Sequence, residues 1–400
     1  MEFSFSKELL QLKAMVSKFV DKDLAPFAAE YDKKENPKDC IPWSIIEKAM
    51  GLGLGSAAVP KEFGGSGLSS LEILTIIEEL ARGDAGFAYT LLSTITGAQL
   101  ITKFGTDEQK NQWLTKIAND QTKRFLMGFA LSEPQTGSDN MSPNPNAGML
   151  TTAELTDGQY IINGTKSFIT NAGIAGLYLV WARTDKSKGA PQGGLSVFLV
   201  PADAPGLKVG KIEDKMGNRL SQQGELIFEN CIIPASNLLG KEGMGLPVCL
   251  AMIENRFSTV GAIGTGIAQA AFNISYKYAK ERVQGGAPII NQQAISHKLA
   301  NILIAIESSR LLYQKAAWHL DNMIPGMVIG SMSKVAGSEA AIMASNETIQ
   351  ILGCYGYSRE YPAEKLLRDS KALSICESAN EVQRSNIIMM LQMMEQKPQG

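Results

Sequence analysis

QYIINGTKSFIT, residues 159–170, breaks the helical periodicity that much of the sequence follows. Strand-forming residues stand on both sides of Asn163-Gly164, and this dipeptide is a strong signal for the tight turn of a β-hairpin. Further segments with strand character, separated by turn sequences such as PQGG and DAPG, are GLYLVWART (176–184), GLSVFLVP (194–201) and GELIFENCIIP (224–234). We therefore predict a small antiparallel sheet domain or barrel over residues 129–238.

The sequence on either side of this region is helical. LQLKAMVSKFVDKDL (10–24) and the long segment 71–101 carry apolar residues at the i, i+3, i+4 spacing of amphipathic helices. Long helical patterns return after the β region, at residues 291–322 and 331–353. The predicted fold is α+β and multi-domain, with an N-terminal helical domain (1–128), a middle β domain (129–238) and a C-terminal helical domain (239–400).

Composition excludes several classes of function. The net charge is −2 and the pI about 5.9, so the chain has no electrostatic basis for holding nucleic acid. No apolar stretch is long enough to span a membrane, and the N-terminus lacks the apolar core of a signal peptide. Five scattered cysteines and only two histidines argue against a metal site, a disulfide framework or a Ser-His-Asp triad. We expect a cytoplasmic protein without metal.

Two glycine-rich segments, GLGLGSA (51–57) and GAIGTGIA (261–268), loosely resemble dinucleotide-binding fingerprints. Neither follows a predicted strand, and the Rossmann interpretation requires strand, turn and helix in that order. We therefore interpret both as sites of turns and tight helix packing.

Two other motifs are better suited to a cofactor. FALSEPQTGSD (129–139) leaves a predicted strand and enters a loop that exposes backbone N–H groups and hydroxyls. SFIT (167–170) ends a strand with an aromatic residue and a threonine, which would form the wall and the hydrogen-bond donor of a site for a flat ring. Taken alone, the first is a turn and the second an ordinary strand.

The motifs together resemble the acyl-CoA dehydrogenase family over essentially the whole chain. FALSEPQTGSD and SFIT resemble that family's flavin motifs. The other motifs that carry the resemblance are ERVQGG (281–286) with Gln293, QILGCYGY (350–357) and YPAEKLLRDSKALSICESANEVQR (361–384). The resemblance implies a C-terminal four-helix bundle, an FAD cofactor, an acyl-CoA substrate, an electron-transfer flavoprotein as partner, and a homotetramer.

The resemblance also implies roles for individual residues. Ser138 and Arg256 would bind the CoA part of the substrate, although a helix arginine is otherwise solvated or ion-paired. The residues that would contact the FAD of their own subunit are Phe129, Leu131, Ser132, Phe168, Thr170 and Asn380. The residues that would contact the FAD of a neighbouring subunit are Arg282, Gln293, Gln350 and Gly353.

Glu377 matches the family's catalytic base. A C–H group next to a thioester is a very weak acid, so a carboxylate must take that proton while the β-hydride leaves to the flavin. A water-poor site would raise the pKa of this glutamate and make it a stronger base. The small neighbours Ser378 and Ala379 would allow flavin and thioester to approach, and the Glu377 N–H would polarise the thioester carbonyl.

The sequence also departs from the family pattern. Ile253 stands where an aspartate is common, Gly285 where a phenylalanine is expected, and Phe168 where a tryptophan is usual. At residues 377–379 this chain has Glu-Ser-Ala where the family has Glu-Gly-Thr. The segment 140–150 is longer than usual, and it either reshapes the substrate site or is a tolerated surface insertion.

Other functions stay open at this level. The same fold supports cyclic diene formation, decarboxylating oxidation or enoyl-CoA reduction, in which Asp84 is either a second acid/base or a local cap or ion-pair partner. A flavin-containing binding protein of the family's DNA-damage-response branch is less consistent with the acidic pI. The leading interpretation is oxidation of an acyl-CoA to its 2,3-enoyl-CoA.

Overall fold

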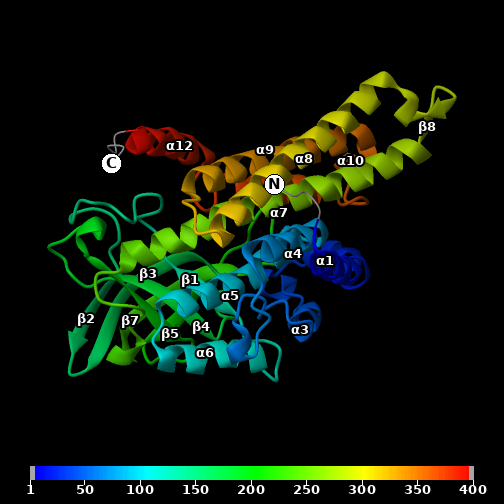
Figure 1. Ribbon diagram of the computed structural model, residues 1–400. Coiled ribbons are helices and arrows are strands. Elements are labelled where there is room, and N and C mark those ends of the chain that lie inside the picture. Colours follow the sequence, from blue (N-terminus) through cyan, green and yellow to red (C-terminus); the bar gives the residue numbers. More distant parts are fainter. Residues whose placement is uncertain (1–4, 396–400) are drawn as a thin grey trace.

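A computed structural model describes residues 5–395 (Figure 1). Helices come first, a mixed sheet follows, and long helices complete the chain, so the predicted fold class is confirmed. The N-terminal helices are α1 (Lys7–Phe19), α2 (Ala25–Asp32), α3 (Trp43–Gly51), α4 (Ser70–Gly83), α5 (Ala85–Phe104) and α6 (Asp107–Asn119). The C-terminal helices are α7 (Gly245–Glu281), α8 (Gln293–Asp321), α9 (Met327–Leu352), α10 (Cys354–Tyr357), α11 (Ala363–Leu373) and α12 (Asn380–Glu395).

The sheet has the strand order β1-β4-β2-β3-β7-β6. The seventh strand, β5, lies off this path and pairs with β4. Most neighbours are antiparallel, as predicted, but β1 and β4 run parallel. A parallel pair requires a long crossover, and β2 and β3 form part of this one. The strands are β1 (Met127–Ala130), β2 (Thr152–Thr156), β3 (Gln159–Thr170), β4 (Leu177–Arg183), β5 (Leu195–Pro201), β6 (Leu207–Ile212) and β7 (Gln223–Pro234).

The predicted hairpin turn at Asn163-Gly164 is wrong. β3 runs straight through this dipeptide and pairs with β7, with a register shift between Ile162 and Gly164. A Cβ atom on Gly164 would lie 2.5 Å from the Thr151 hydroxyl, so glycine is needed here for a close approach rather than for a turn. The hairpin turn lies at Asp157-Gly158, whose φ angles of +49° and +76° fit a two-residue turn between β2 and β3.

The glycines of GAIGTGIA lie inside α7 and bring three helices close together. A Cβ atom on Gly264 would lie 2.2 Å from the carbonyl oxygen of Gly337 in α9. One on Gly266 would lie 2.3 Å from the carbonyl oxygen of Glu78 in α4. The interpretation of this motif as tight helix packing is therefore confirmed.

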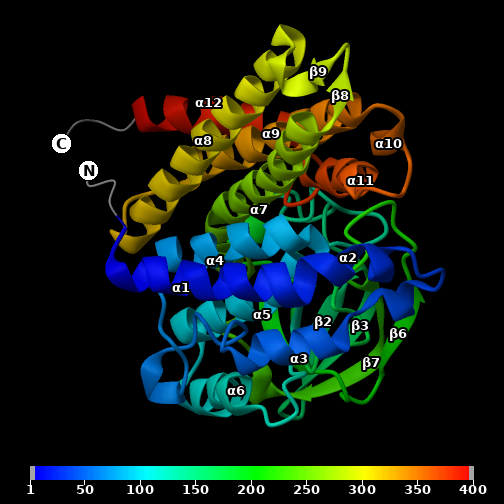
Figure 2. The ribbon, with the colours of Figure 1, turned by 90° about the vertical axis from the view of Figure 1, so that its right-hand side faces the viewer.

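The long helices α7 and α8 extend from the sheet to a small ribbon, β8 (Val283–Gln284) paired with β9 (Ala287–Pro288), at their far end (Figure 1). Figure 2 shows the N-terminal helices and the sheet side by side beneath this bundle. Within residues 5–395, no helix combines the length and the apolar character needed to cross a membrane.

Replacing Gly264 with alanine tests the close contact between α7 and α9. The added methyl group meets a main-chain carbonyl that cannot rotate away, so we expect the free energy of unfolding to fall by about 1–3 kcal/mol. Gly51→Ala is the matched control, because no atom lies within 4 Å of the position of its Cβ and the residue also lies in a helix. Urea unfolding followed by circular dichroism measures both changes, and an equal effect of the two substitutions would contradict the packing role.

Candidate active site

Glu377 lies in a strained loop between α11 and α12. Glu377 and Ser378 have φ angles of +50° and +72°, although neither is a glycine. The loop is held by hydrogen bonds from the Cys376 N–H to the Ala372 carbonyl (2.9 Å) and from the Asn380 N–H to the Ser374 carbonyl (3.1 Å). Left-handed backbone at two successive non-glycine residues is costly and is characteristic of functional sites.

Arg256 of α7 holds the Glu377 carboxylate. Its Nε donates to Glu377 Oε1 at 2.9 Å, and its Nη2 donates to the same oxygen. The two side chains are only 7% and 16% exposed. Burial alone would lower the pKa of Arg256, but the carboxylate of Glu377 raises it, so the guanidinium stays charged. Arg256 therefore lies against Glu377, and its predicted contact with CoA remains a prediction.

Phe129 brings the sheet to this pair. Phe129 lies in β1, and its ring centre is 5.7 Å from the Arg256 guanidinium and 6.3 Å from the ring of Trp181. A strand, a long helix and the loop before α12 therefore converge at one point, as the predicted site requires.

Tyr89 of α5 completes this cluster and was not identified from the sequence. Its hydroxyl lies 3.1 Å from the Cys376 sulfur, next to Glu377. Burial raises the pKa of the Tyr89 phenol well above its usual range and also raises that of the Cys376 thiol, so both groups keep their protons. A tyrosine among the apolar residues of a predicted core helix carries no signal that distinguishes it from a packing residue.

The two predicted flavin motifs lie side by side. The Ser167 N–H donates to the Ser132 carbonyl at 3.0 Å, which joins FALSEPQTGSD to the end of β3. Phe168 has a φ angle of +56°, sits where the register of β3 shifts, and is 62% exposed. Thr170 accepts a hydrogen bond from Gln223 at 3.2 Å. Leu131 lies partly buried on the same segment as Ser132.

A buried ion pair fastens these motifs together. Lys166 Nζ donates to Glu133 Oε1 at 2.9 Å and to the Leu131 carbonyl at 3.1 Å, and Glu133 also accepts from the backbone N–H groups of Leu150 (2.6 Å) and Thr151 (2.9 Å). Burial lowers the pKa of Lys166 to about 8, while its partner opposes this change. The two residues stand 33 positions apart, so their pairing could not be predicted from the sequence.

The 140–150 segment is anchored near both of its ends. Arg183 donates to the carbonyls of Ala147 and Met149, both at 3.1 Å, and the Ala190 N–H donates to the Ser142 carbonyl at 2.9 Å. Ser138, which precedes the segment, is exposed. The contact of Ser138 with CoA and the effect of this segment on the substrate remain predictions.

Four predicted cofactor residues lie elsewhere in this chain. Arg282, Gln293, Gln350 and Gly353 are all exposed, and the Arg282 guanidinium lies 6.0 Å from the ring centre of Tyr355. Arg282 directly precedes β8, which Figure 1 shows at the end of the bundle opposite to β1 and β3. A single subunit therefore does not bring these residues to Glu377.

Asn380 and Asp84 are engaged in local contacts. The Asn380 side chain accepts a hydrogen bond from Lys334 at 2.6 Å and donates one to Ser338 at 2.9 Å. Its contact with flavin stays a prediction. Asp84 caps α5 by accepting from the Phe87 N–H at 2.7 Å, and it pairs with Lys365, so its predicted local role is confirmed.

Glu254, next to the departure at Ile253, contacts the residue that precedes α9. It accepts a hydrogen bond from the Gly326 N–H at 2.7 Å.

Comparisons with known proteins agree with this arrangement. Family models for the N-terminal, middle and C-terminal domains of acyl-CoA dehydrogenase match residues 6–121, 128–231 and 243–392. The chain belongs to the acyl-CoA dehydrogenase family. It is accordingly an oxidoreductase that acts on acyl-CoA, and its cofactor is FAD.

Two similar proteins match almost the whole chain. The mitochondrial short-chain specific acyl-CoA dehydrogenase of Rattus norvegicus is 40% identical over 369 residues, which are 92% of this chain and 85% of the relative. The acryloyl-CoA reductase (NADH) of Anaerotignum propionicum is 37% identical over 388 residues, which are 96% of this chain and 94% of the relative.

Two solved structures are similar over the full fold. Butyryl-CoA dehydrogenase from Megasphaera elsdenii has a TM-score of 0.92 and 36% identity, with 98% of this chain and 100% of that chain covered. A chain from a structure described as the electron transferring flavoprotein of Acidaminococcus fermentans has a TM-score of 0.91 and 36% identity, covering 98% of this chain and 99% of that one.

Glu133→Gln tests whether the buried ion pair maintains this acyl-CoA dehydrogenase site. Because fully buried Lys166 would lose its one carboxylate partner among residues 5–395, we expect a loss of about 3–5 kcal/mol in the free energy of unfolding. Glu154→Gln is the control, since Glu154 and its partner Lys186 are both 65% exposed and such pairs contribute less than about 1 kcal/mol. Urea unfolding at neutral pH compares the two variants, and similar losses would contradict the structural role of the buried pair.

Proposed function

We propose that this enzyme oxidises acyl-CoA to 2,3-enoyl-CoA, with Glu377 as the base that removes the α-proton. The observation that supports this proposal best is the largely buried Glu377 carboxylate, held by Arg256 at the point where β1, α5 and α7 converge. A fixed carboxylate in a site with little water is what removal of a weakly acidic C–H proton requires.

The two oxygens of the carboxylate have different tasks in this proposal. Arg256 donates twice to Oε1 and fixes the plane of the carboxylate. Among residues 5–395 no protein group donates a hydrogen bond to Oε2, so this oxygen is available to accept the proton. The Glu377 N–H likewise has no backbone partner among these residues and is available to polarise the thioester carbonyl.

The residues near Glu377 fit a flavin ring. Phe168 presents an exposed aromatic surface from a strained position, and the nearby Ser167 hydroxyl is buried without a hydrogen-bond partner. Phe129, Leu131, Ser132 and Thr170 would line the same ring. Bound FAD supplies the acceptor for the hydride that leaves the β-carbon.

The neighbouring subunit would complete the cofactor site. Arg282, Gln293, Gln350 and Gly353 are exposed around the far end of α7, where a second copy of the chain can reach them. Arg282 would bind the diphosphate of a neighbour's FAD, because a guanidinium binds phosphate through paired hydrogen bonds. We propose a homotetramer in which subunits exchange these contacts.

An electron-transfer flavoprotein is the proposed electron acceptor. The similar chain in a structure described as an electron transferring flavoprotein supports this partner.

The relative named acryloyl-CoA reductase (NADH) supports a second candidate function, reduction of an enoyl-CoA on the same site. Comparing the rates of butyryl-CoA oxidation and crotonyl-CoA reduction under anaerobic conditions separates the two.

Glu377→Gln tests the proposed base. The amide keeps the shape of the side chain but cannot accept the α-proton, so the rate of the chemical step should fall by at least roughly 10²–10⁴-fold. Stopped-flow measurement of flavin bleaching by acyl-CoA gives this rate, and the flavin spectrum verifies that FAD is retained. Reduction of the variant at close to the native rate would assign the proton transfer to another residue.

Mixed oligomers test the shared cofactor site. Arg282→Ala and Glu377→Gln should each inactivate the enzyme alone, because one damages the contact to a neighbour's FAD and the other the base. Co-expression should restore activity, since sites with Glu377 from one chain and Arg282 from the other are intact. Phe168→Ala co-expressed with Glu377→Gln is the control, because both changes affect the same chain's side of the site. Restoration of activity in the control, or none in the first pair, would contradict the arrangement.

A further inference from the structure

The contact between Tyr89 and Cys376 closes one side of the active site. Tyr89 is 8% exposed, and its hydroxyl lies 3.1 Å from the sulfur of the residue directly before Glu377. This contact links α5 to the loop that carries the base. Because the phenol and the thiol both have raised pKa values, neither can exchange a proton easily near neutral pH. The contact is therefore a steric feature rather than an acid–base pair.

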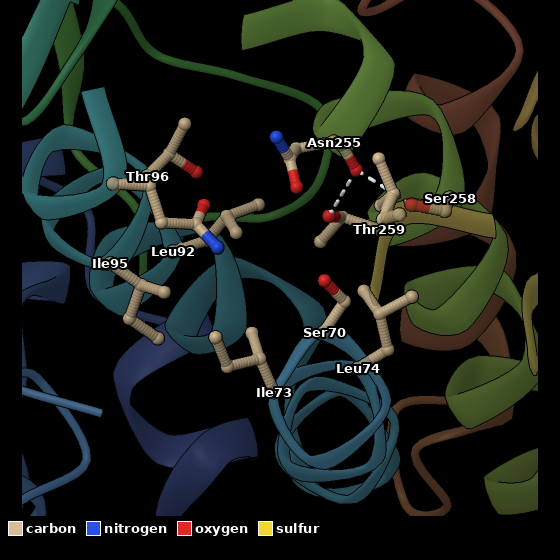
Figure 3. Close-up of a pocket in the computed structure, with 11 residues that line it drawn as sticks. Ser70, Ile73, Leu74, Leu92, Ile95, Thr96, Asn255, Ser258 and Thr259 are labelled. Atoms are coloured by element: carbon tan, nitrogen blue, oxygen red, sulfur yellow. Dashed lines mark hydrogen bonds between the residues drawn. The ribbon is translucent and has the colours of Figure 1, made fainter. Parts of the chain in front are cut away.

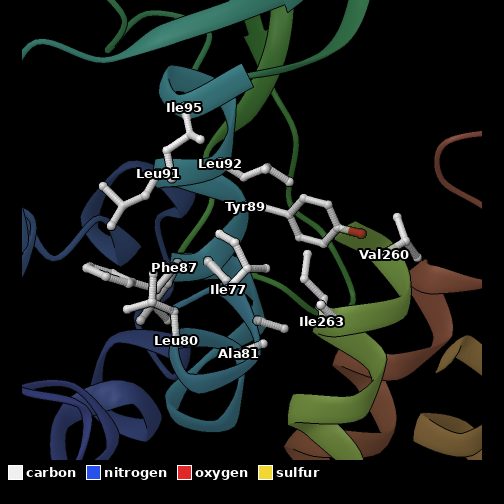
Figure 4. Close-up of a cluster of buried hydrophobic side chains, with 14 of the residues drawn as sticks. Ile77, Leu80, Ala81, Phe87, Tyr89, Leu91, Leu92, Ile95, Val260 and Ile263 are labelled. Atoms are coloured by element: carbon white, nitrogen blue, oxygen red, sulfur yellow. The ribbon is translucent and has the colours of Figure 1, made fainter. Parts of the chain in front are cut away.

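The space around the Tyr89 ring is filled. Figure 4 shows the ring reaching from α5 toward Val260 and Ile263 of α7, with Leu92 beside it on the same helix. These residues belong to one buried hydrophobic cluster, in which Leu92, Val260 and Ile263 are at most 2% exposed. On its sheet side, the Arg256–Glu377 pair is met by Phe129, a predicted cofactor residue. An acyl group beside Glu377 must therefore extend between α5 and α7, toward Tyr89.

A small hollow lies further along α5 (Figure 3). Leu92 follows Tyr89 by three residues and lines this hollow together with Thr96, one turn further on, and Thr259 of α7. Asn255 and Ser258, which flank Arg256 in the sequence, line it as well. A longer acyl chain would need an open path from the base to this hollow. The Tyr89 hydroxyl lies beside the residue that precedes the base, and Leu92, which lies beside the Tyr89 ring, lines the hollow.

We infer that Tyr89, anchored by Cys376, sets the acyl-chain length and restricts the enzyme to short acyl groups such as butyryl. The inference rests on the proposed function, because it takes Glu377 as the position of the α-carbon. Tyr89 acts here by its volume and touches the end of the acyl group. Packing against Leu92, Val260 and Ile263 keeps the ring in place, and the contact with the Cys376 thiol adds to it.

Acyl-CoA binding measures this effect without turnover. In the Glu377→Gln background, the dissociation constants of butyryl-CoA and hexanoyl-CoA are compared with and without Tyr89→Ala. Each methylene that enters an apolar pocket improves binding by roughly fourfold. With Tyr89 present, hexanoyl-CoA should bind no more tightly than butyryl-CoA. With alanine, the ratio of the two affinities should shift toward hexanoyl-CoA by about tenfold, and kcat/KM in the Glu377 enzyme should shift in the same direction.

Two variants separate acyl-chain selection from a general loss of packing. Tyr89→Phe keeps the ring volume and should keep the native ratio. Leu91→Ala also shortens a fully buried side chain of α5, but Leu91 points away from Tyr89 (Figure 4), so this variant should keep the native ratio. Tyr89→Val is measured alongside and should shift the ratio as alanine does, which keeps the test valid if the alanine variant does not fold.

Three results would overturn the inference: an unchanged ratio in the folded Tyr89 variants, an equal shift in Leu91→Ala, or native protein that already prefers hexanoyl-CoA tenfold. If the binding ratios shift as expected but the Glu377 enzyme oxidises no acyl-CoA, the inference about chain length holds and the proposed function fails.

Discussion

In the proposed reaction, a buried carboxylate must be held in place and still be able to accept a proton, and this constraint accounts for the arrangement of the site. Arg256 meets it by donating to one oxygen of Glu377 only. The left-handed backbone at Glu377 and Ser378 serves the same constraint. It turns the carboxylate toward α7, which continued helical backbone between α11 and α12 would not do. Strain of this kind persists only where the surrounding hydrogen bonds determine the conformation, as those from Cys376 and Asn380 do.

Pairs of buried charges join parts of the fold that are distant in the sequence. Lys166 and Glu133 connect β3 to the loop after β1, Lys365 connects α11 to the start of α5 through Asp84, and Arg310 connects α8 to Glu78 in α4. Each partner would be costly to bury alone, so each pair strongly disfavours arrangements in which its two segments separate.

The order of helices and sheet could be predicted from the spacing of apolar residues. Burial of one face repeats apolar residues about every 3.6 positions in a helix and every 2 positions in a strand. Local signals were less reliable where a long-range contact determined the geometry. Asn163-Gly164 has the composition of a turn, yet Gly164 is there because Thr151 approaches it, and the turn falls at Asp157-Gly158. Arg256 was identified as a site residue, but its partner lies 121 positions away and could not be read from its neighbours. Tyr89 left no signal at all, since its environment is made by α7 and the loop before α12.

The glycine contact between α7 and α9 has a consequence for how this enzyme can vary. Arg256 stands five residues before Gly261, whose backbone meets that of Gly337 so closely that a Cβ on Gly337 would lie 2.5 Å from the Gly261 carbonyl oxygen. The position of α7 along α9 and its rotation about its own axis are therefore determined by contacts between the two backbones. The shapes of side chains, which substitutions can change, do not determine them. Substitutions on the outer faces of the bundle can accumulate without moving the guanidinium, so this outer surface is free to diverge while the position of the Glu377 carboxylate stays the same.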